Sequence, residues 1–431
     1  MNTCYQNRRG LLLNHIDEGI IVIPTSREKI RNKDAHYPFR PDSYFYYLTG
    51  FTEPDAVLVL HKNGGNKSTI FCREKNIEKE IWDGFRLGPS SAPASLDVDE
   101  AFPIDELDKL MPKFLENQES VYSVIGVDTH WDSKIISWLN QTRSKVRTGI
   151  RAPSSLKDIR RYLDEMRLIK DETELNIMRS AAKISSVAHI AAMKATAPNK
   201  NEYEVEAELL YHFKKHGSEF PAYTSIVAGG ANSCVLHYIE NNQKLKDGDL
   251  LLIDAGCELH GYASDITRTF PINGKYTQAQ KEVYSIVLNA QEAAIGQVKA
   301  GNSWQAPHEA ALKILAEGMV ALGLLKGSVE EVIETEAFSR FYMHRTGHWL
   351  GMDVHDVGDY KTNGQWRNLE PGMVLTVEPG MYIRKAPDIP KDFWNIGIRI
   401  EDDVVVTSGS CEILTTDTPK SITDVEAIMA N

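Results

Sequence analysis

The sequence predicts an α+β protein of two domains, and three observations support this prediction. The chain has 431 residues, more than a single hydrophobic core usually serves. Short apolar strands mix with helical segments over roughly the first 150 residues, which is typical of an α/β domain. The rest of the chain alternates helices with strands in closely spaced pairs. Short connections between strands imply antiparallel pairing rather than a doubly wound parallel sheet.

In the first domain, strands are expected wherever a short apolar or β-branched run is bounded by turn residues. These runs are residues 20–24 (IIVIP), 56–60 (AVLVL) and 69–72 (TIFC). Apolar spacing predicts helices at 104–116 and 132–143. Residues 147–158 (RTGIRAPSSLKD) are rich in Pro, Ser and Gly and are expected to form a linker. We therefore expect domains at residues 1–158 and 159–431.

The second domain is expected to open with one long amphipathic helix that starts at Asp164. Within it, Asp171 is a helix-cap residue followed three positions later by Glu174. Further helices are expected at 204–216, 278–299 and 308–323. The expected strand pairs are 250–255 with 264–270, and 374–378 with 398–406.

Composition excludes several classes of function. The net charge of −12 and the lack of a long Lys/Arg run disfavour a nucleic-acid partner. No apolar run is long enough to cross a membrane, and the three leucines near the N-terminus are too few for a signal-peptide core. Five widely spaced cysteines without a CxxC pair are typical of reduced thiols. These features predict a cytoplasmic globular protein.

Five residues in distinctive short settings predict a metal site. They are Asp254 (LLLIDAG), Asp265 (YASDITRTF), His348 (HRTGHWLGMDVHD), Glu378 (VLTVEPG) and Glu401 (GIRIEDD). Four carboxylates and one imidazole can share a pocket only if cations neutralise them, and two divalent ions would balance that charge. Oxygen-rich ligands with a single nitrogen suit Mn²⁺, Co²⁺, Zn²⁺ or Fe²⁺. Hydrolysis by metal-activated water is the leading hypothesis.

Strand geometry supports this grouping. A tight turn centred on Leu259 and His260 would set Asp254 directly opposite Asp265, with their Cβ atoms about 4.5–5.5 Å apart. In IGIRIEDD the isoleucines fall on one face of the strand, so Arg399 and Glu401 share the other and both enter the site. Each acidic residue taken alone could be a turn residue, a strand-end cap or part of a solvated edge. Their joint occurrence favours the metal site.

These motifs closely resemble the proline-specific metalloaminopeptidases with the pita-bread fold, in particular bacterial aminopeptidase P. The resemblance covers essentially the whole chain, from YFYYLTGFTEPDAVLVL (44–60) and EIWDGFRLG (80–88) to GHWLGMDVHDVG and LEPGMVLTVEPG. It implies an N-terminal creatinase-like α/β domain and a C-terminal pita-bread catalytic domain with an antiparallel sheet. The implied activity releases the N-terminal residue from peptides whose second residue is proline.

The resemblance also implies roles for the site residues. Asp254 would hold one ion, Asp265 and Glu401 would bridge two, and His348 and Glu378 would complete the other. Glu378 would also accept the proton of the bridging water, and Mn²⁺ would be the preferred ion. The remaining residues would line the substrate pocket or orient the ligands. These are the catalytic residues His237, His344, His355 and Arg399, of which His237 and His355 also bind substrate, and Tyr382.

By the same resemblance, Asp34, Arg147 and Trp82 are accessory residues, with Trp82 reaching the substrate pocket of a neighbouring subunit in a homotetramer built as a dimer of dimers. The alternative for Trp82 is burial in the core of its own domain. Arg345 departs from the family, since many relatives in the wider fold have glycine there, which affects the rim of the pocket and the preference for peptide length.

Three other enzymes of this fold and one non-enzymatic class remain as alternatives. Prolidase would use the same five ligands on Xaa-Pro dipeptides, but EIWDGFRLG and the overall layout favour aminopeptidase P. Methionine aminopeptidase generally lacks the N-terminal domain, and creatinase lacks the metal ligands. Binding modules of this fold in histone chaperones and growth-regulating proteins have lost the ligands, whereas all five are present here.

Overall fold

The computed structural model describes residues 2–62 and 65–430. It divides into two compact units, one ending at Asp164 and one beginning at Glu165. Both units combine helices with sheets, so the predicted two-domain α+β class is confirmed. The domain boundary expected at 158/159 stays a prediction, because the division by compactness falls inside a helix. Within the described residues, no helix is both long and apolar enough to span a bilayer.

The N-terminal unit is a mixed sheet of six strands in the order β6-β5-β4-β1-β7-β8. Its elements are α1 (Asn2–His15), β1 (Gly19–Pro24), β2 (Ile30–Asn32), β3 (Ala35–His36), α2 (Ser43–Thr49), β4 (Val57–Lys62), β5 (Asn66–Cys72), α3 (Ile77–Asp83), α4 (Ala92–Leu96), β6 (Glu100–Pro103), α5 (Leu107–Phe114), β7 (Ser120–Ser123), α6 (Thr129–Arg143) and β8 (Ser155–Asp158), followed by α7 (Arg160–Leu168). The three predicted strands and two predicted helices of this domain are confirmed.

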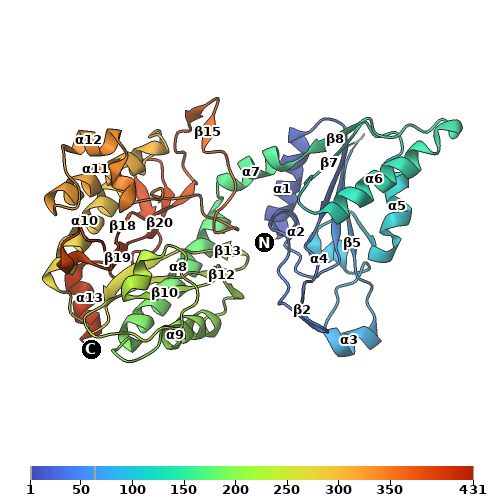
Figure 1. Ribbon diagram of the computed structural model, residues 1–431. Helices are drawn as coiled ribbons and strands as arrows, with labels where there is room; N and C mark the ends of the chain where they lie inside the picture. The colour runs from blue at the N-terminus through green and yellow to red at the C-terminus, as the bar shows by residue number, and fades with distance from the viewer. Residues whose placement is uncertain (1, 63–64, 431) are drawn as a thin grey trace. The chain divides into compact units, whose positions relative to one another are not determined.

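Helices cover both faces of this sheet (Figure 1). Alternate residues of β1 and β4, such as Val22 and Val59, pack with Met111 of α5 and Trp138 of α6. Helices α1 and α2 contact β4 and lie over the opposite face. Since both faces are buried, the strand sequences are continuous apolar runs rather than alternating ones.

In the C-terminal unit every strand pair among the described residues is antiparallel. Its elements are α8 (Glu172–Ala195), α9 (Glu202–Lys215), β9 (Phe220–Pro221), β10 (Ile226–Gly229), β11 (Leu250–Asp254), β12 (Cys257–Leu259), β13 (Tyr262–Ala263), β14 (Thr267–Pro271), α10 (Gln278–Ile295), α11 (Gln305–Ala321), α12 (Val329–Glu334), β15 (Lys361–Thr362), β16 (Gln365–Trp366), β17 (Val374–Val377), β18 (Gly380–Ile383), β19 (Ile396–Arg399), β20 (Asp402–Val406), β21 (Cys411–Ile413) and α13 (Ile422–Met429).

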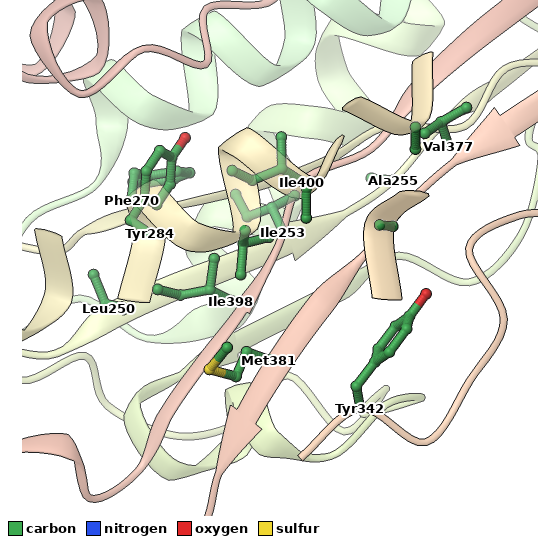
Figure 2. Close-up of a cluster of buried hydrophobic side chains, with 14 of the residues drawn as sticks. Leu250, Ile253, Ala255, Phe270, Tyr284, Tyr342, Val377, Met381, Ile398 and Ile400 are labelled. Carbon is green, nitrogen blue, oxygen red and sulfur yellow. The ribbon is translucent and has the colours of Figure 1, made fainter. Parts of the chain in front are cut away.

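Two helix pairs support this set of strands. Helices α8 and α9 pack on each other and contact β10, β12 and β13, whereas α10 and α11 pack on each other and α10 contacts β17, β18 and β19. The core between helices and strands is apolar, as Figure 2 shows for Ile253, Phe270, Tyr284, Ile398 and Ile400. This packing fixes the strand ends that carry the acidic motifs.

The long helix expected from Asp164 is two helices, so that prediction was wrong. Helix α7 ends at Leu168 and α8 begins at Glu172. Asp171 forms the predicted capping box with Glu174, and a capping box starts a new helix rather than continuing an old one. The cap itself was therefore the signal for the break.

Two further expectations on strands need correction. The expected linker includes β8, which pairs in parallel with β7 at the edge of the N-terminal sheet. The expected strand 398–406 is split at residues 400 and 401, where β19 pairs with β18 and β20 pairs with β17. The split places Glu401 between two sheets instead of within one.

A buried ion network lies next to this split. The carboxylate of Asp402 accepts hydrogen bonds of 2.7 Å from Arg268, Thr415, Gln291 and Lys420. Burial would raise the pKa of Asp402, but Arg268 and Lys420 outweigh it and lower the pKa to about 2. The network ties β14 and the C-terminal segment to β20.

We expect Asp402→Asn to lower the free energy of unfolding by about 3–5 kcal/mol, because it leaves a buried arginine without its counter-charge. Urea unfolding monitored by circular dichroism measures the change. Asp388→Asn is the matched control, since Asp388 pairs with Arg340 at the surface and should change stability little. Equal effects of the two substitutions would contradict this expectation.

Candidate metal centre

The five predicted ligands come from five short segments and converge on one cavity of about 520 Å³. Most stand at or beside a strand end. Asp254 is the last residue of β11, Asp265 lies two residues before β14, and Glu401 lies between β19 and β20. Glu378 directly follows β17, and His348 precedes Trp349, which bridges to β17 at Leu375. Strand ends are fixed by the sheet yet leave the side chain free to face a cavity.

The predicted register between the two aspartates was wrong. The turn is formed by His260 and Gly261, so Asp254 lies opposite Thr267 and Asp265 is the diagonal neighbour on the same face. The close approach of the two segments requires glycine at 256, since a Cβ there would lie 1.7 Å from the carbonyl oxygen of Ser264. Asp254 and Asp265 therefore still lie close together in the observed register.

Arg399 and the hydroxyl groups around it orient the carboxylates. Its Nη2 donates to Oδ2 of Asp254 at 2.6 Å, and its Nε donates to the Thr267 hydroxyl at 3.1 Å. The Thr267 hydroxyl donates in turn to Oε2 of Glu401 at 2.6 Å. Tyr223 places its hydroxyl 2.6 Å from Asp254 and also hydrogen-bonds to Asp265. Oε1 of Glu378 accepts a hydrogen bond from the buried hydroxyl of Thr376 at 3.3 Å, so each of the four acidic side chains is held by a neighbour.

The pKa values of the clustered carboxyl groups are raised, which indicates that the site lacks positive charge. Burial raises the pKa of Glu401 well above its ordinary value, and the charges of Asp265 and Glu378 raise it further. Burial likewise raises the pKa of Glu378 to about 7. The pKa of Asp265 is raised by burial and then by the charge of Asp254. The carboxylates cannot all ionise together unless cations join them.

His348 is oriented as a metal ligand. Its Nδ1–H donates to the carbonyl oxygen of Trp349 at 2.9 Å, which leaves Nε2 facing Asp265 at 3.5 Å and Glu378 at 3.7 Å. Ligand atoms of His348, Asp265 and Glu401 all lie within 4.8 Å of one another. A buried, oxygen-rich cluster with one imidazole nitrogen fits hard or borderline divalent ions.

The other predicted site residues of this unit also line the cavity or support it. His237, His344, His355 and Arg399 line it, and the ring of His355 stacks on that of His348 at 4.0 Å. Tyr382 is buried beneath the cavity, where its hydroxyl accepts from Nη1 of Arg399 at 2.9 Å and lies 2.8 Å from Nε2 of His344. Burial lowers the pKa of both His344 and His355 to about 4, so both are neutral at pH 7.

The three accessory residues lie in the N-terminal unit, whereas the residues that line this cavity belong to the C-terminal unit. Asp34 is exposed in the turn between β2 and β3, and Arg147 is exposed after α6. Trp82 is 87% exposed on α3, so the alternative of a core tryptophan was wrong. The predicted roles of these residues stay predictions.

Sequence reasoning missed Tyr223, Thr267 and Asp403. Asp403 lies behind the site and accepts from the backbone N–H of Asp265 at 3.0 Å. Thr267 could have been found, because it is two residues from Asp265 and strand alternation puts both on one face. Tyr223 offered no such signal, since it comes from a segment more than thirty positions upstream of its partners.

Comparisons with known proteins agree with this geometry. Residues 176–408 match the model of metallopeptidase family M24, and residues 5–122 match the N-terminal domain of aminopeptidase P. The chain belongs to metallopeptidase family M24. It is 48% identical to the Xaa-Pro aminopeptidase of Haemophilus influenzae over 93% of this chain and 91% of that protein.

Solved structures of this family superpose on the whole chain. Aminopeptidase PepP of Pseudomonas aeruginosa matches with a TM-score of 0.99 and 46% identity, covering 100% of this chain and 98% of that one. A zinc-substituted aminopeptidase P of Escherichia coli in complex with product matches with a TM-score of 0.97 and 42% identity, again over 100% and 98%. The pita-bread fold and the metal-dependent aminopeptidase class are therefore those of this protein.

We expect the protein held in excess chelator to lose stability as the pH rises from about 6.5 to about 9. Burial alone would lower the pKa of His348, but the hydrogen bond with Asp265 and the charges of Glu378 and Asp265 outweigh it and raise the pKa from 6.5 to about 9. In this range the folded state binds a proton that the unfolded state has lost, so a rise in pH favours unfolding. Urea unfolding at a series of pH values measures the slope.

Burial lowers the pKa of four other histidines to about 4. These histidines make stability rise with pH, but only below pH 6.5. They are His189, His308, His344 and His355. His348→Gln should therefore reduce the slope above pH 6.5 to the part that comes from Glu378 and Glu401, whose pKa values burial raises, and an added divalent ion should flatten the curve by replacing the protons. A curve of unchanged slope in the His348 variant would contradict the assignment.

Proposed function

We propose that this protein removes the N-terminal residue from peptides whose second residue is proline, using water activated between two divalent metal ions. The observation that carries the proposal is the convergence of four carboxylates and one imidazole on a single cavity. The names and structures of its relatives, which include a product complex, support the same activity.

We assign the ligands as the sequence predicted them. Asp254, Asp265 and Glu401 would hold one ion, and Asp265, His348, Glu378 and Glu401 the other, with Asp265 and Glu401 shared. When bound, the ions neutralise the carboxylates, lower the pKa of a bound water and polarise the scissile carbonyl group. We propose Mn²⁺ as the native ion on the strength of the oxygen-rich ligand set, with Zn²⁺, Co²⁺ and Fe²⁺ as alternatives.

The side chains around the ions divide the remaining tasks. Glu378 faces the ion-bound water, so its carboxylate would take a proton from that water and return it to the leaving nitrogen. Arg399 fixes Asp254 and, through Tyr382, the ring of His344. His237 and His355 line the outer part of the cavity, where they can donate to the substrate.

Proline specificity has a physical basis in this arrangement. An Xaa-Pro bond is a tertiary amide without an N–H, so the enzyme cannot position it through that hydrogen bond. The free α-amino group of the substrate would instead be held at the end of the cavity where the metal ligands lie. Neutral histidines can then recognise the carbonyl group and leave room for the proline ring.

We expect Arg-Pro-Pro to be cut, Arg-Ala-Ala to be spared, and N-acetylation of Arg-Pro-Pro to block turnover, because the amine is a recognition element. Chromatographic detection of released arginine is the measurement. Excess chelator should abolish activity, and Mn²⁺ should restore it.

The same assay separates aminopeptidase P from prolidase. Turnover of Arg-Pro alone, with Arg-Pro-Pro uncut, would replace the proposal with dipeptidase activity. Equal turnover of the acetylated peptide would show that the free amine is not needed for substrate recognition. Full activity in chelator would exclude the metal mechanism.

We also propose a cytoplasmic homotetramer, arranged as a dimer of dimers, in which Trp82 contributes to a neighbouring subunit. Helix α3 and the residues after it expose an unusual set of apolar side chains. They are Ile77, Ile81, Trp82 and Phe85, exposed by 76%, 76%, 87% and 69%. Such a cluster on an otherwise acidic protein is typical of an interface, and tryptophan is a common anchor there.

We expect Trp82→Ala to reduce assembly and tripeptide turnover while leaving the melting temperature nearly unchanged, since so exposed a side chain adds little to its own domain. Sedimentation velocity and kcat/KM are the measurements. Ile136→Ala, which removes an apolar side chain half exposed on α6, is the matched control. A fully active monomer would contradict the proposal.

A further inference from the structure

Arg345 is a cation at the rim of the cavity. The proposed function assigns it no role. It lies three residues before His348 and lines the same cavity as the carboxylates, with its side chain exposed to solvent. The residue before it, His344, hydrogen-bonds through Nδ1 to the carbonyl oxygen of Arg345 at 2.7 Å. The backbone at 345 is therefore tied to the catalytic histidine, while the side chain faces outwards.

The charge of Arg345 is not neutralised by the protein. Two arginines line the cavity, and Arg399 is fully committed to Asp254, Thr267 and Tyr382. In the described parts of the chain, no carboxylate lies within ion-pair distance of Arg345. Partial burial lowers its pKa, and the more distant Glu309 does not offset this. The guanidinium is therefore a cation that faces solvent without a counter-ion.

Two neutral side chains hold this guanidinium in place. Its carbon lies 4.8 Å from the centre of the Trp366 ring, on the β15–β16 hairpin, and Nη2 donates to Oε1 of Gln305 at the start of α11. Nζ of Lys361 lies 4.2 Å from the same ring and adds positive charge. Cation–π contacts orient a guanidinium without cancelling its charge.

We infer that Arg345 is a specificity-determining residue that binds a carboxylate located beyond the proline of the substrate. The inference rests on the proposed function, which places the substrate amine at the end of the cavity where the metal ligands lie. The chain of the substrate then leads outwards past the rim. The carboxylate is either the C-terminus of a tripeptide or an acidic side chain at the third position, and both suit the fork of a guanidinium.

Three peptides test this inference: Arg-Pro-Ala, its C-terminal amide, and the amide of Arg-Pro-Glu. We expect kcat/KM about tenfold higher for Arg-Pro-Ala than for its amide, the size of effect expected of a hydrogen bond to a charged group. In Arg345→Met, which keeps the length and removes the charge, this ratio should fall to about one. Arg345→Lys should keep part of it, because lysine retains charge but not the fork.

The controls separate this inference from the proposed function. Arg340→Met removes an exposed arginine that pairs with Asp388 outside the cavity, and it should leave the ratio unchanged. A matching preference for the Arg-Pro-Glu amide would show that a side-chain carboxylate also binds, and a preference confined to Arg-Pro-Ala would assign the C-terminus. If neither Arg-Pro-Ala nor the Arg-Pro-Glu amide is preferred over the Arg-Pro-Ala amide by the unmodified enzyme, or if such a preference survives Arg345→Met, the inference alone is overturned. Failure to cut any of the three peptides would overturn the proposed function as well.

Discussion

The mutual repulsion of four buried carboxylates is the constraint on which the rest of this structure depends. Each of them costs free energy to desolvate, and each raises the cost of ionising the next. Burial and neighbouring charges raise the pKa of Glu378 and Glu401 accordingly. The positive charge of Arg399 and the hydroxyl donors of Tyr223 and Thr267 offset part of this repulsion. Binding of divalent ions would offset the rest. Stability and catalysis are linked here, because the charges that destabilise the site are those that bind the ions.

A rigid scaffold is needed to hold such a cluster in place. Antiparallel strands supply it: β11, which ends at Asp254, lies between β10 and β14, and β20, which follows Glu401, lies between β17 and β21. Close backbone approach adds to this rigidity: a Cβ at Gly347 would lie 2.0 Å from the carbonyl oxygen of Thr376, so only glycine allows the adjoining His348 to reach the site. Behind the site, the buried pair of Arg268 and Asp402 joins β14 to β20 next to Glu401. Packing, rather than the ligands themselves, determines where the ligands lie.

The cavity is lined by acidic, neutral and basic side chains. Its lining combines the carboxylates, the neutral histidines His344 and His355, and Arg345, whose guanidinium lies against the ring of Trp366. A peptide with a free amine at one end and a carboxylate at the other has the complementary arrangement of charges. With Arg345 binding a carboxylate as inferred, the site would favour short peptides whose C-terminus reaches that guanidinium, in addition to recognising proline.

The sequence by itself determined the α+β class, most elements and the identity of the acidic motifs, because periodicity and turn residues act over a few neighbouring positions. It also brought Arg399 and Glu401 to one site, although the strand on which that prediction relied ends at Arg399. Only the tertiary structure decided the register of Asp254 against Thr267, which depends on one residue in a turn. Only the tertiary structure revealed Tyr223 as a partner of two aspartates and Trp366 as a support for Arg345. Contacts between distant segments follow from how the whole core packs, and no local pattern encodes that packing.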